Sequence, residues 1–167
     1  MSANHLQNLT FVWFRPDLRI HDNPCLHAAI KQGLVQPIYL LDPRTFQATS
    51  FGLARIGTHR RRFLRESLEN LRTQLESIGL DLLILNAKPE EFFPKLLKSI
   101  QHAKLFFSYE YAFEETQIEA ALAYELSSAQ WEGFWTGTLM DPENLPFTLE
   151  NVPNGFSSFR NKVEKYA

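Results

Sequence analysis

The charged residues after the first apolar run form the most regular set of chemically capable side chains in this chain. Residues 9–14 are largely apolar, and Arg15, Asp17, Arg19 and Asp22 follow at short intervals. Such side chains form ion pairs that fix a turn, or they contact a ligand or a partner domain. The loop contains no glycine, so it does not match the phosphate-binding turn of common dinucleotide-binding proteins. We expect a structural ion-pair network here, with a ligand or partner contact as the alternative.

Two adjacent carboxylates, Glu114 and Glu115, open a helix expected over residues 113–126. The helix dipole favours negative charge at that position, so their spacing alone is typical of ordinary helix-start residues. Cys25 and His27 are too close together and too isolated to form a zinc site. The sequence contains no nucleophile elbow, no Walker lysine motif and no paired metal ligands, so it predicts no metal centre.

Five basic residues gather at the start of the longest expected helix, namely His59, Arg60, Arg61, Arg62 and Arg65. Cations at a helix N-terminus oppose the helix dipole, so an acidic group should compensate for them. Glu66, Glu69, a neighbouring domain and a nucleic-acid phosphate are the candidates. We expect pairing within the chain or with a neighbouring domain.

The three tryptophans, Trp13, Trp131 and Trp135, invite an electron-transfer role. They fall on strand-like segments, however, and large aromatic side chains on strands usually fill a core. We therefore expect them to pack in the core.

The bulk composition is typical of one soluble domain with a substantial core. The chain has 167 residues and a formal net charge of −2, so no strong positive field attracts nucleic acid. Its single cysteine excludes an internal disulfide and suits a reducing compartment. No apolar run approaches the roughly 20 residues of a membrane helix, and residues 1–10 lack signal-peptide character. We expect a cytoplasmic protein.

Strand-like and helix-like segments alternate along most of the chain. The strand candidates are Leu9–Phe14, Val35–Leu41, Asp81–Asn86, Lys104–Ser108 and, more weakly, Gln130–Trp135. Helices are expected from Pro24 to Gly33, over residues 58–78, from Pro89 to Ile100, over residues 113–126 and over residues 156–166. This alternation predicts an α/β fold: a Rossmann-like three-layer sandwich with a five-stranded parallel sheet and helices on both faces.

Two helices carry finer expectations. In the helix over residues 58–78, one apolar face is formed by Phe63, Leu64, Leu68, Leu71, Leu75 and Ile78. In the next helix, Pro94 conflicts with a start at Pro89, so that helix either begins later or is kinked.

The pattern breaks after Trp135. Residues 136–155 are rich in proline and glycine, which is typical of an irregular connection or a linker. The final segment, residues 156–166, predicts a short amphipathic helix with Phe159 and Val163 facing inward.

Several motifs resemble the photolyase/cryptochrome family. Its opening signature is matched by Trp13-Phe14-Arg15-x-Asp17-Leu18-Arg19-x-x-Asp22-Asn23. Five further segments resemble the DASH-type cryptochromes in particular. They are Asp42-Pro43-Arg44-x-Phe46, Phe51-Gly52, Arg60-x-x-Phe63-Leu64-x-Glu66-Ser67-Leu68-x-x-Leu71, Thr138-Leu139-x-x-Pro142-x-x-Leu145-Pro146-Phe147 and Phe156-x-x-Phe159-Arg160-x-x-Val163-Glu164. These segments occur in the family order along nearly the whole chain.

The resemblance implies an N-terminal α/β domain that a long linker joins to a helical, FAD-binding domain. In that family, reduced flavin donates an electron to a cyclobutane pyrimidine dimer, and an antenna pigment, commonly methenyltetrahydrofolate, feeds light energy to the flavin. We therefore expect residues 1–135 to form the α/β domain and residues 136–167 a linker region with a short C-terminal helix. The FAD-binding helical domain is expected to be absent, so the chain is not catalytic alone and contacts DNA only indirectly.

The resemblance also identifies a cofactor site. Glu115 corresponds to the family's pterin-binding glutamate, and Glu114 stands where some relatives carry asparagine. The expected function is binding of an antenna chromophore for flavin-dependent repair or blue-light sensing, with an FAD-binding helical domain as partner in cis or in trans. One alternative is a stand-alone protein-interaction module that has lost its pigment and can form a homo-oligomer. Another is a small nucleotide-binding α/β protein.

Overall fold

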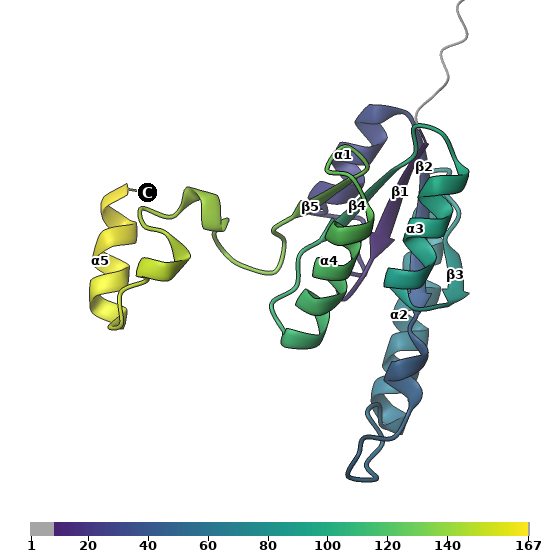
Figure 1. Cartoon of the computed structure of the whole chain (residues 1–167), viewed down its shortest axis with the longest axis horizontal. Coiled ribbons are helices and arrows are strands. Elements are labelled where there is room, and N and C mark those ends of the chain that lie inside the picture. The colour runs from purple at the N-terminus through teal and green to yellow at the C-terminus, as the bar shows by residue number, and fades with distance from the viewer. Residues whose placement is uncertain (1–8, 167) are drawn as a thin grey trace, which may run out of the picture.

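A five-stranded parallel sheet forms the centre of the protein in the computed structural model, which describes residues 9–166 (Figure 1). The strands are β1 (Leu9–Phe14), β2 (Leu34–Leu41), β3 (Leu83–Asn86), β4 (Lys104–Ser108) and β5 (Trp131–Phe134). Their order across the sheet is β3-β2-β1-β4-β5, and each neighbouring pair is parallel. The predicted α/β fold with a five-stranded parallel sheet is confirmed.

Helices connect the strands on both faces. They are α1 (Pro24–Gln32), α2 (Thr58–Ser77), α3 (Pro89–Ser99), α4 (Phe113–Glu125) and α5 (Phe156–Tyr166). Short 3-10 turns cover Pro43–Phe46, Pro142–Asn144 and Leu149–Asn151. At the start of α1, the Asn23 side chain accepts a hydrogen bond of 2.9 Å from the backbone N–H of Leu26, which caps the helix as its sequence predicts.

The core has two layers because side chains alternate across each strand. Phe11 and Trp13 of β1 pack on the side of α3 and α4, whereas Val12 and Phe14 pack on the side of α1 and α2. Figure 1 shows these two helix pairs on opposite faces of the sheet. Strands β1 and β4, at the centre, are almost wholly buried, while β3 lies at the sheet edge and is only partly covered.

One expectation about α2 needs correction. Phe63 and Ile78 do not belong to its buried face, because they are 70% and 47% exposed, whereas Leu68, Leu71 and Leu75 are buried. Helix α3 begins at Pro89, as predicted, and of the two ways to accommodate Pro94 a later start is excluded, because the helix continues through this buried residue.

The order of the strands creates a switch point between β1 and β4. From β1 the chain proceeds through α1 and α2 to β2 and β3, and it then crosses to β4 with α3 and α4 on the other face. Connections therefore diverge at the carboxyl ends of β1 and β4. In open α/β sheets this divergence leaves a crevice in which ligands bind.

The segment after β5 leaves the sheet and ends in α5, which lies apart from the rest of the protein in Figure 1. Helix α5 has no buried residue, although Phe159 and Val163 are half-buried. Phe159 packs edge-on against Phe147, with ring centroids 5.5 Å apart. None of the helices between residues 9 and 166 is both long and apolar enough to cross a lipid bilayer.

Candidate functional site

An open cleft of about 920 Å³ lies at the carboxyl edge of the sheet. Its walls are the residues that follow β1, β2 and β4, the first turns of α2, and the first turns of α4. The position is the switch-point crevice, and the volume is within the range of ligand pockets. Both aromatic and charged side chains line it, including Trp13, Tyr39, Arg60 and Glu110.

A buried polar network adjoins this cleft through Arg15, which lines it. The Arg15 guanidinium forms an ion pair with Glu119 of α4 and donates to the carbonyl oxygen of Ser108 at 3.0 Å. Asp17 accepts a hydrogen bond from the backbone N–H of Arg15 at 3.1 Å and another from the Ser108 hydroxyl. Glu119 also accepts from the backbone N–H of Glu110 at 3.0 Å. Arg15, Asp17 and Glu119 are all buried, and their bonds link the ends of β1 and β4 to α4.

The loop after β1 therefore forms the expected structural network of charged groups. Its main ion pair, however, is made with α4 and not within the loop. Arg15 forms its ion pair with Glu119, while Arg19 and Asp22 make exposed contacts: an ion pair of 3.7 Å and a hydrogen bond of 3.2 Å from Arg19 Nε to the Asp22 carbonyl oxygen. Sequence reasoning missed Glu119. Its signal was its position three residues before the buried Leu122, which places a carboxylate on the inner face of α4.

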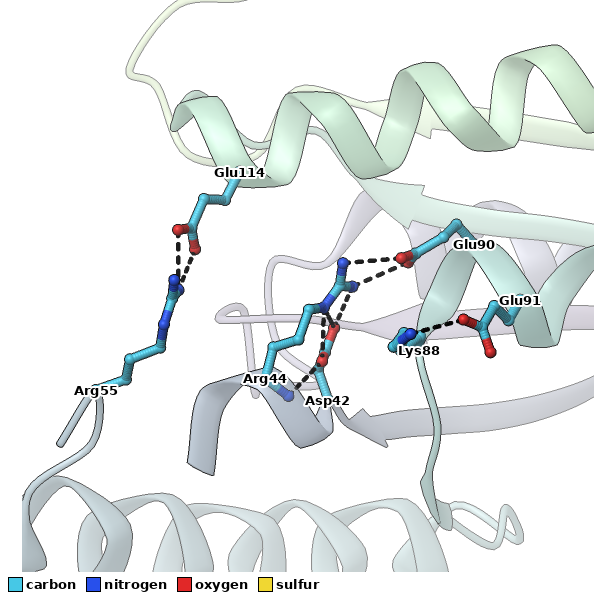
Figure 2. A network of polar contacts seen from close by, with 7 residues as sticks. All are labelled: Asp42, Arg44, Arg55, Lys88, Glu90, Glu91 and Glu114. Carbon is cyan, nitrogen blue, oxygen red and sulfur yellow. Dashed lines mark hydrogen bonds and ion pairs between the residues drawn. The ribbon is translucent and has the colours of Figure 1, made fainter. Parts of the chain in front are cut away.

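A second group of ion pairs joins the loop after β2 to α3 (Figure 2). Arg44 lies between Asp42 and Glu90: its Nε donates to the two oxygens of Asp42 at 2.9 and 3.0 Å, and its Nη1 is 2.8 Å from Glu90 Oε1. Burial alone would raise the pKa of Asp42, but the hydrogen bonds from Arg44 outweigh burial and lower it. Nearby, Lys88 pairs with Glu91 at 2.8 Å. This group ties the 3-10 turn Pro43–Phe46 to the start of α3.

The two predicted cofactor-binding residues both line the cleft from the first turn of α4, but their surroundings differ. Glu114 is exposed, and its two carboxylate oxygens accept hydrogen bonds from Arg55 Nη1 at 2.9 and 2.6 Å (Figure 2). The hydrogen bond from Arg55 lowers the pKa of Glu114. Glu115 is half-buried and makes no ion pair within residues 9–166.

A third carboxylate of the cleft, that of Glu110, lies in surroundings that disfavour its charged form. Burial raises the pKa of Glu110, and the positive charge of Arg15 only partly offsets this effect. Burial likewise raises the pKa of Tyr39 on the opposite wall, against the opposing influence of Arg60. The cleft is therefore a partly dehydrated site in which polar groups are available near apolar walls.

The basic start of α2 is only partly compensated. Arg62 pairs with Glu66 at 2.7 Å and Arg65 approaches Glu69 at 4.0 Å, so the expected pairing within the chain is present for these two. In the described part of the chain, Arg60 and Arg61 make no ion pair; the Arg61 guanidinium lies 5.6 Å from the centroid of the Phe46 ring.

All three tryptophans pack among other aromatic side chains, but the predicted place in the core holds for Trp13 and Trp131 and not for Trp135, which lies outside both core layers. Trp13 is buried against Phe93 and Phe107, and Trp131 stacks on Phe107 with centroids 5.2 Å apart. Trp135 is half-buried between two tyrosines, Tyr109 and Tyr111. Gly133 permits this packing, because a Cβ there would lie 2.3 Å from the Tyr109 ring.

The remaining candidate groups do not form a reactive site. Cys25 is buried, and burial raises the pKa of its thiol to about 12, so the thiolate is strongly disfavoured. Within residues 9–166, no three His, Cys, Asp or Glu side chains gather closely enough to hold a metal ion.

Comparisons with known proteins agree with this architecture. A family profile described as DNA photolyase matches residues 10–167. A cryptochrome DASH of Synechocystis sp. is 37% identical over 164 residues, which represent 96% of this chain and 34% of that protein. The crystal structure of a Synechocystis sp. cryptochrome superposes with a TM-score of 0.84 and 39% identity, over 94% of this chain and 33% of that chain.

A more distant structure shares the fold alone. The photolyase of the archaeon Sulfolobus tokodaii, solved with two FAD molecules that imply a novel light-harvesting cofactor in that protein, is 21% identical with a TM-score of 0.73. The alignment covers 94% of this chain and 35% of that chain. This chain thus spans about a third of the length of the relatives it matches. With residues 10–167 matched and the signature loop in place around the buried Arg15, the chain belongs to the DNA photolyase family, and its relatives include the DASH cryptochromes.

Proposed function

We propose that this chain is the antenna-chromophore-binding α/β unit of a DASH-type cryptochrome or photolyase, and that the chromophore is methenyltetrahydrofolate bound in the cleft. Bound methenyltetrahydrofolate would absorb near-ultraviolet light and pass the energy to a flavin. The flavin would be FAD held by a helical domain that acts with this chain in cis or in trans. The unit then serves repair of pyrimidine dimers or blue-light sensing and does no chemistry alone.

The state of Glu115 carries this proposal. It is a half-buried carboxylate in the first turn of α4, and it lines the cleft without an ion pair in the described residues, whereas its neighbour Glu114 is engaged by Arg55. A carboxylate at this position is an acceptor for the amino and N–H donors of a pterin ring. The helix dipole stabilises its negative charge there.

The cleft fits such a ligand in other respects. A pterin is planar and aromatic, and the cleft walls combine aromatic side chains with a small number of polar groups. Glu114 was predicted as a second contact, but its bond to Arg55 leaves Glu115 as the carboxylate that we assign to the pterin.

An equilibrium titration tests this function. Purified protein is mixed with methenyltetrahydrofolate, and the near-ultraviolet absorption and fluorescence are recorded for wild type, Glu115→Gln and Glu125→Gln. We expect a shifted, protein-bound absorption band for wild type and for Glu125→Gln, whose site is at the far end of the same helix and paired with Lys98. Loss of one charge-assisted hydrogen bond should weaken binding to Glu115→Gln about 10- to 100-fold. No bound band for wild type, or equal affinity of all three proteins, would contradict the proposal.

A second candidate function is that of a protein-interaction module. It is favoured by the apolar side chains exposed on and before α5, including Leu139, Leu149 and Phe156. Such surfaces commonly mediate association. Size-exclusion chromatography with light scattering distinguishes this candidate, because a module of this kind self-associates in a concentration-dependent manner, whereas a monomer at all concentrations argues against it.

A further inference from the structure

We propose that the ion pair between Arg55 and Glu114 is a latch that holds a hairpin, residues 47–55, against α4 and controls access to the cleft. Only the identity of the ligand that enters the cleft depends on the proposed function. The latch itself is a property of the protein and is testable without a ligand.

The hairpin is a small structural unit of its own. The backbone N–H of Thr49 donates to the carbonyl oxygen of Leu53 at 2.7 Å, and the N–H of Arg55 donates to that of Gln47 at 3.4 Å. Gly52 completes the turn with a φ of 76°, a conformation that suits glycine. A single two-stranded hairpin is marginally stable in water, so its order depends on what holds it in place.

Little else holds it. Phe51 and Leu53 are 88% and 68% exposed, so the tip of the hairpin packs on nothing. Within the described chain, Arg55–Glu114 is the one side-chain ion pair or hydrogen bond that joins residues 48–56 to another element. The chain is anchored just outside the hairpin, by the buried Ile56 on one side and by the Arg44 group on the other.

The Arg55–Glu114 pair spans the cleft, whereas Ile56 and the Arg44 group, which hold the chain on either side of the hairpin, do not. Residues 47–50 and Arg55 line one wall, and Glu114 and Glu115 line the opposite wall. Figure 2 shows Arg55 reaching across to Glu114, whereas Arg44 contacts Asp42 and Glu90. Opening the Arg55–Glu114 pair therefore separates two walls of the cleft without disturbing the Arg44 group.

The exposure of the pair makes it suitable for opening. The side chains of Arg55 and Glu114 are 40% and 65% exposed, so water and salt compete with the bond. Exposed pairs of this kind change a local equilibrium by only a few-fold. The latch is therefore strong enough to favour the closed hairpin and weak enough to open during ligand exchange.

Amide hydrogen exchange of the full chain tests the latch directly. We expect Arg55→Gln to raise the exchange rates of the Thr49 and Arg55 amides about two- to fivefold. Lys98→Gln is the matched control, because it removes an exposed pair with Glu125 at the other end of α4. The charge-swapped double variant Arg55→Glu, Glu114→Arg should restore protection. Exchange in Arg55→Gln equal to that of wild type, or no recovery in the swapped variant, would overturn the latch.

A kinetic arm separates this inference from the proposed function. Stopped-flow fluorescence with methenyltetrahydrofolate should show association and dissociation rate constants about two- to fivefold higher in Arg55→Gln than in wild type. Absence of binding to wild type contradicts the function, and the exchange data still decide the latch. Binding with rate constants that Arg55→Gln leaves unchanged contradicts the latch as a gate, although the function stands.

Discussion

Two arginine–carboxylate pairs meet α4 within a few residues of each other, and they differ in burial. The Arg15–Glu119 pair has side chains 5% and 11% exposed and adjoins the cleft through Arg15, while the Arg55–Glu114 pair is exposed at its mouth. A buried pair is costly to break, because either partner alone is an uncompensated charge, whereas an exposed pair is readily solvated. The same chemistry thus fixes the fold at one site and permits movement at the other.

The largest effect should follow from breaking the buried pair. Glu119→Ala leaves the Arg15 guanidinium buried with only the Ser108 carbonyl oxygen as acceptor, so we expect a loss of about 3–5 kcal/mol in unfolding free energy. Urea denaturation followed by circular dichroism measures it. The double variant Arg15→Met, Glu119→Met should recover most of the loss, since it removes both charges. A loss below about 1 kcal/mol in the single variant would contradict a structural role.

The Ser108 hydroxyl is the next test of the buried network. It donates to Asp17 and lies 3.4 Å from the Cys25 sulfur. Ser108→Ala leaves the Asp17 carboxylate with one hydrogen bond fewer in a buried environment, so we expect a cost of about 1–3 kcal/mol in the same assay. Ser99→Ala, in the exposed last turn of α3, is the control and should change little. Equal stability of the two variants would show that the network tolerates the loss.

The Arg44 group is intermediate between the two pairs. Asp42→Asn removes the charge that Arg44 contacts, but the group is partly solvated, so we expect a cost of about 1 kcal/mol or less. The folded-state pKa of Asp42 is lowered, so its contribution is fully present above its ordinary pKa of 3.8 and is lost as the pH falls further. The difference in stability between wild type and Asp42→Asn should therefore shrink below that pH. A difference that grows on acidification would reverse the assigned sign.

The smallest effect on global stability should come from the exposed pair. Arg55→Gln should leave the midpoint of urea unfolding unchanged within error, although it speeds local amide exchange in the hairpin. A clear shift of the midpoint would mean that the Arg55–Glu114 pair supports the fold as Arg15–Glu119 does.

The fold followed from the sequence because apolar strands and helix signals are local. The apolar run Leu9–Phe14 and the helical spacing of Leu68, Leu71 and Leu75 each carry their own signal, and these elements formed close to where they were expected. Phe63 was placed on the buried face of α2 because its helical spacing is right, yet it is exposed.

The ion pairs of the site could not be predicted from the sequence, because they join residues far apart in the chain. Arg15 and Glu119 are 104 positions apart, and Arg55 and Glu114 are 59 apart. Charge alternation predicted an ion-pair network within the first loop and gave no sign of Glu119. Only the sheet order, which places β4 and α4 beside β1, reveals the real partner. The choice of Glu115 came from family resemblance, and its free carboxylate is visible only in the structure.

The central claim is that the cleft between hairpin 47–55 and α4 binds the antenna chromophore. Backbone amide chemical shifts of the isotope-labelled full chain, recorded while methenyltetrahydrofolate is added, test it most directly. We predict saturable changes confined to residues 47–56, 109–118 and the loop after β1, with the largest near Glu115. Changes that centre on α5 or on β3, or no saturable change at all, would contradict the account.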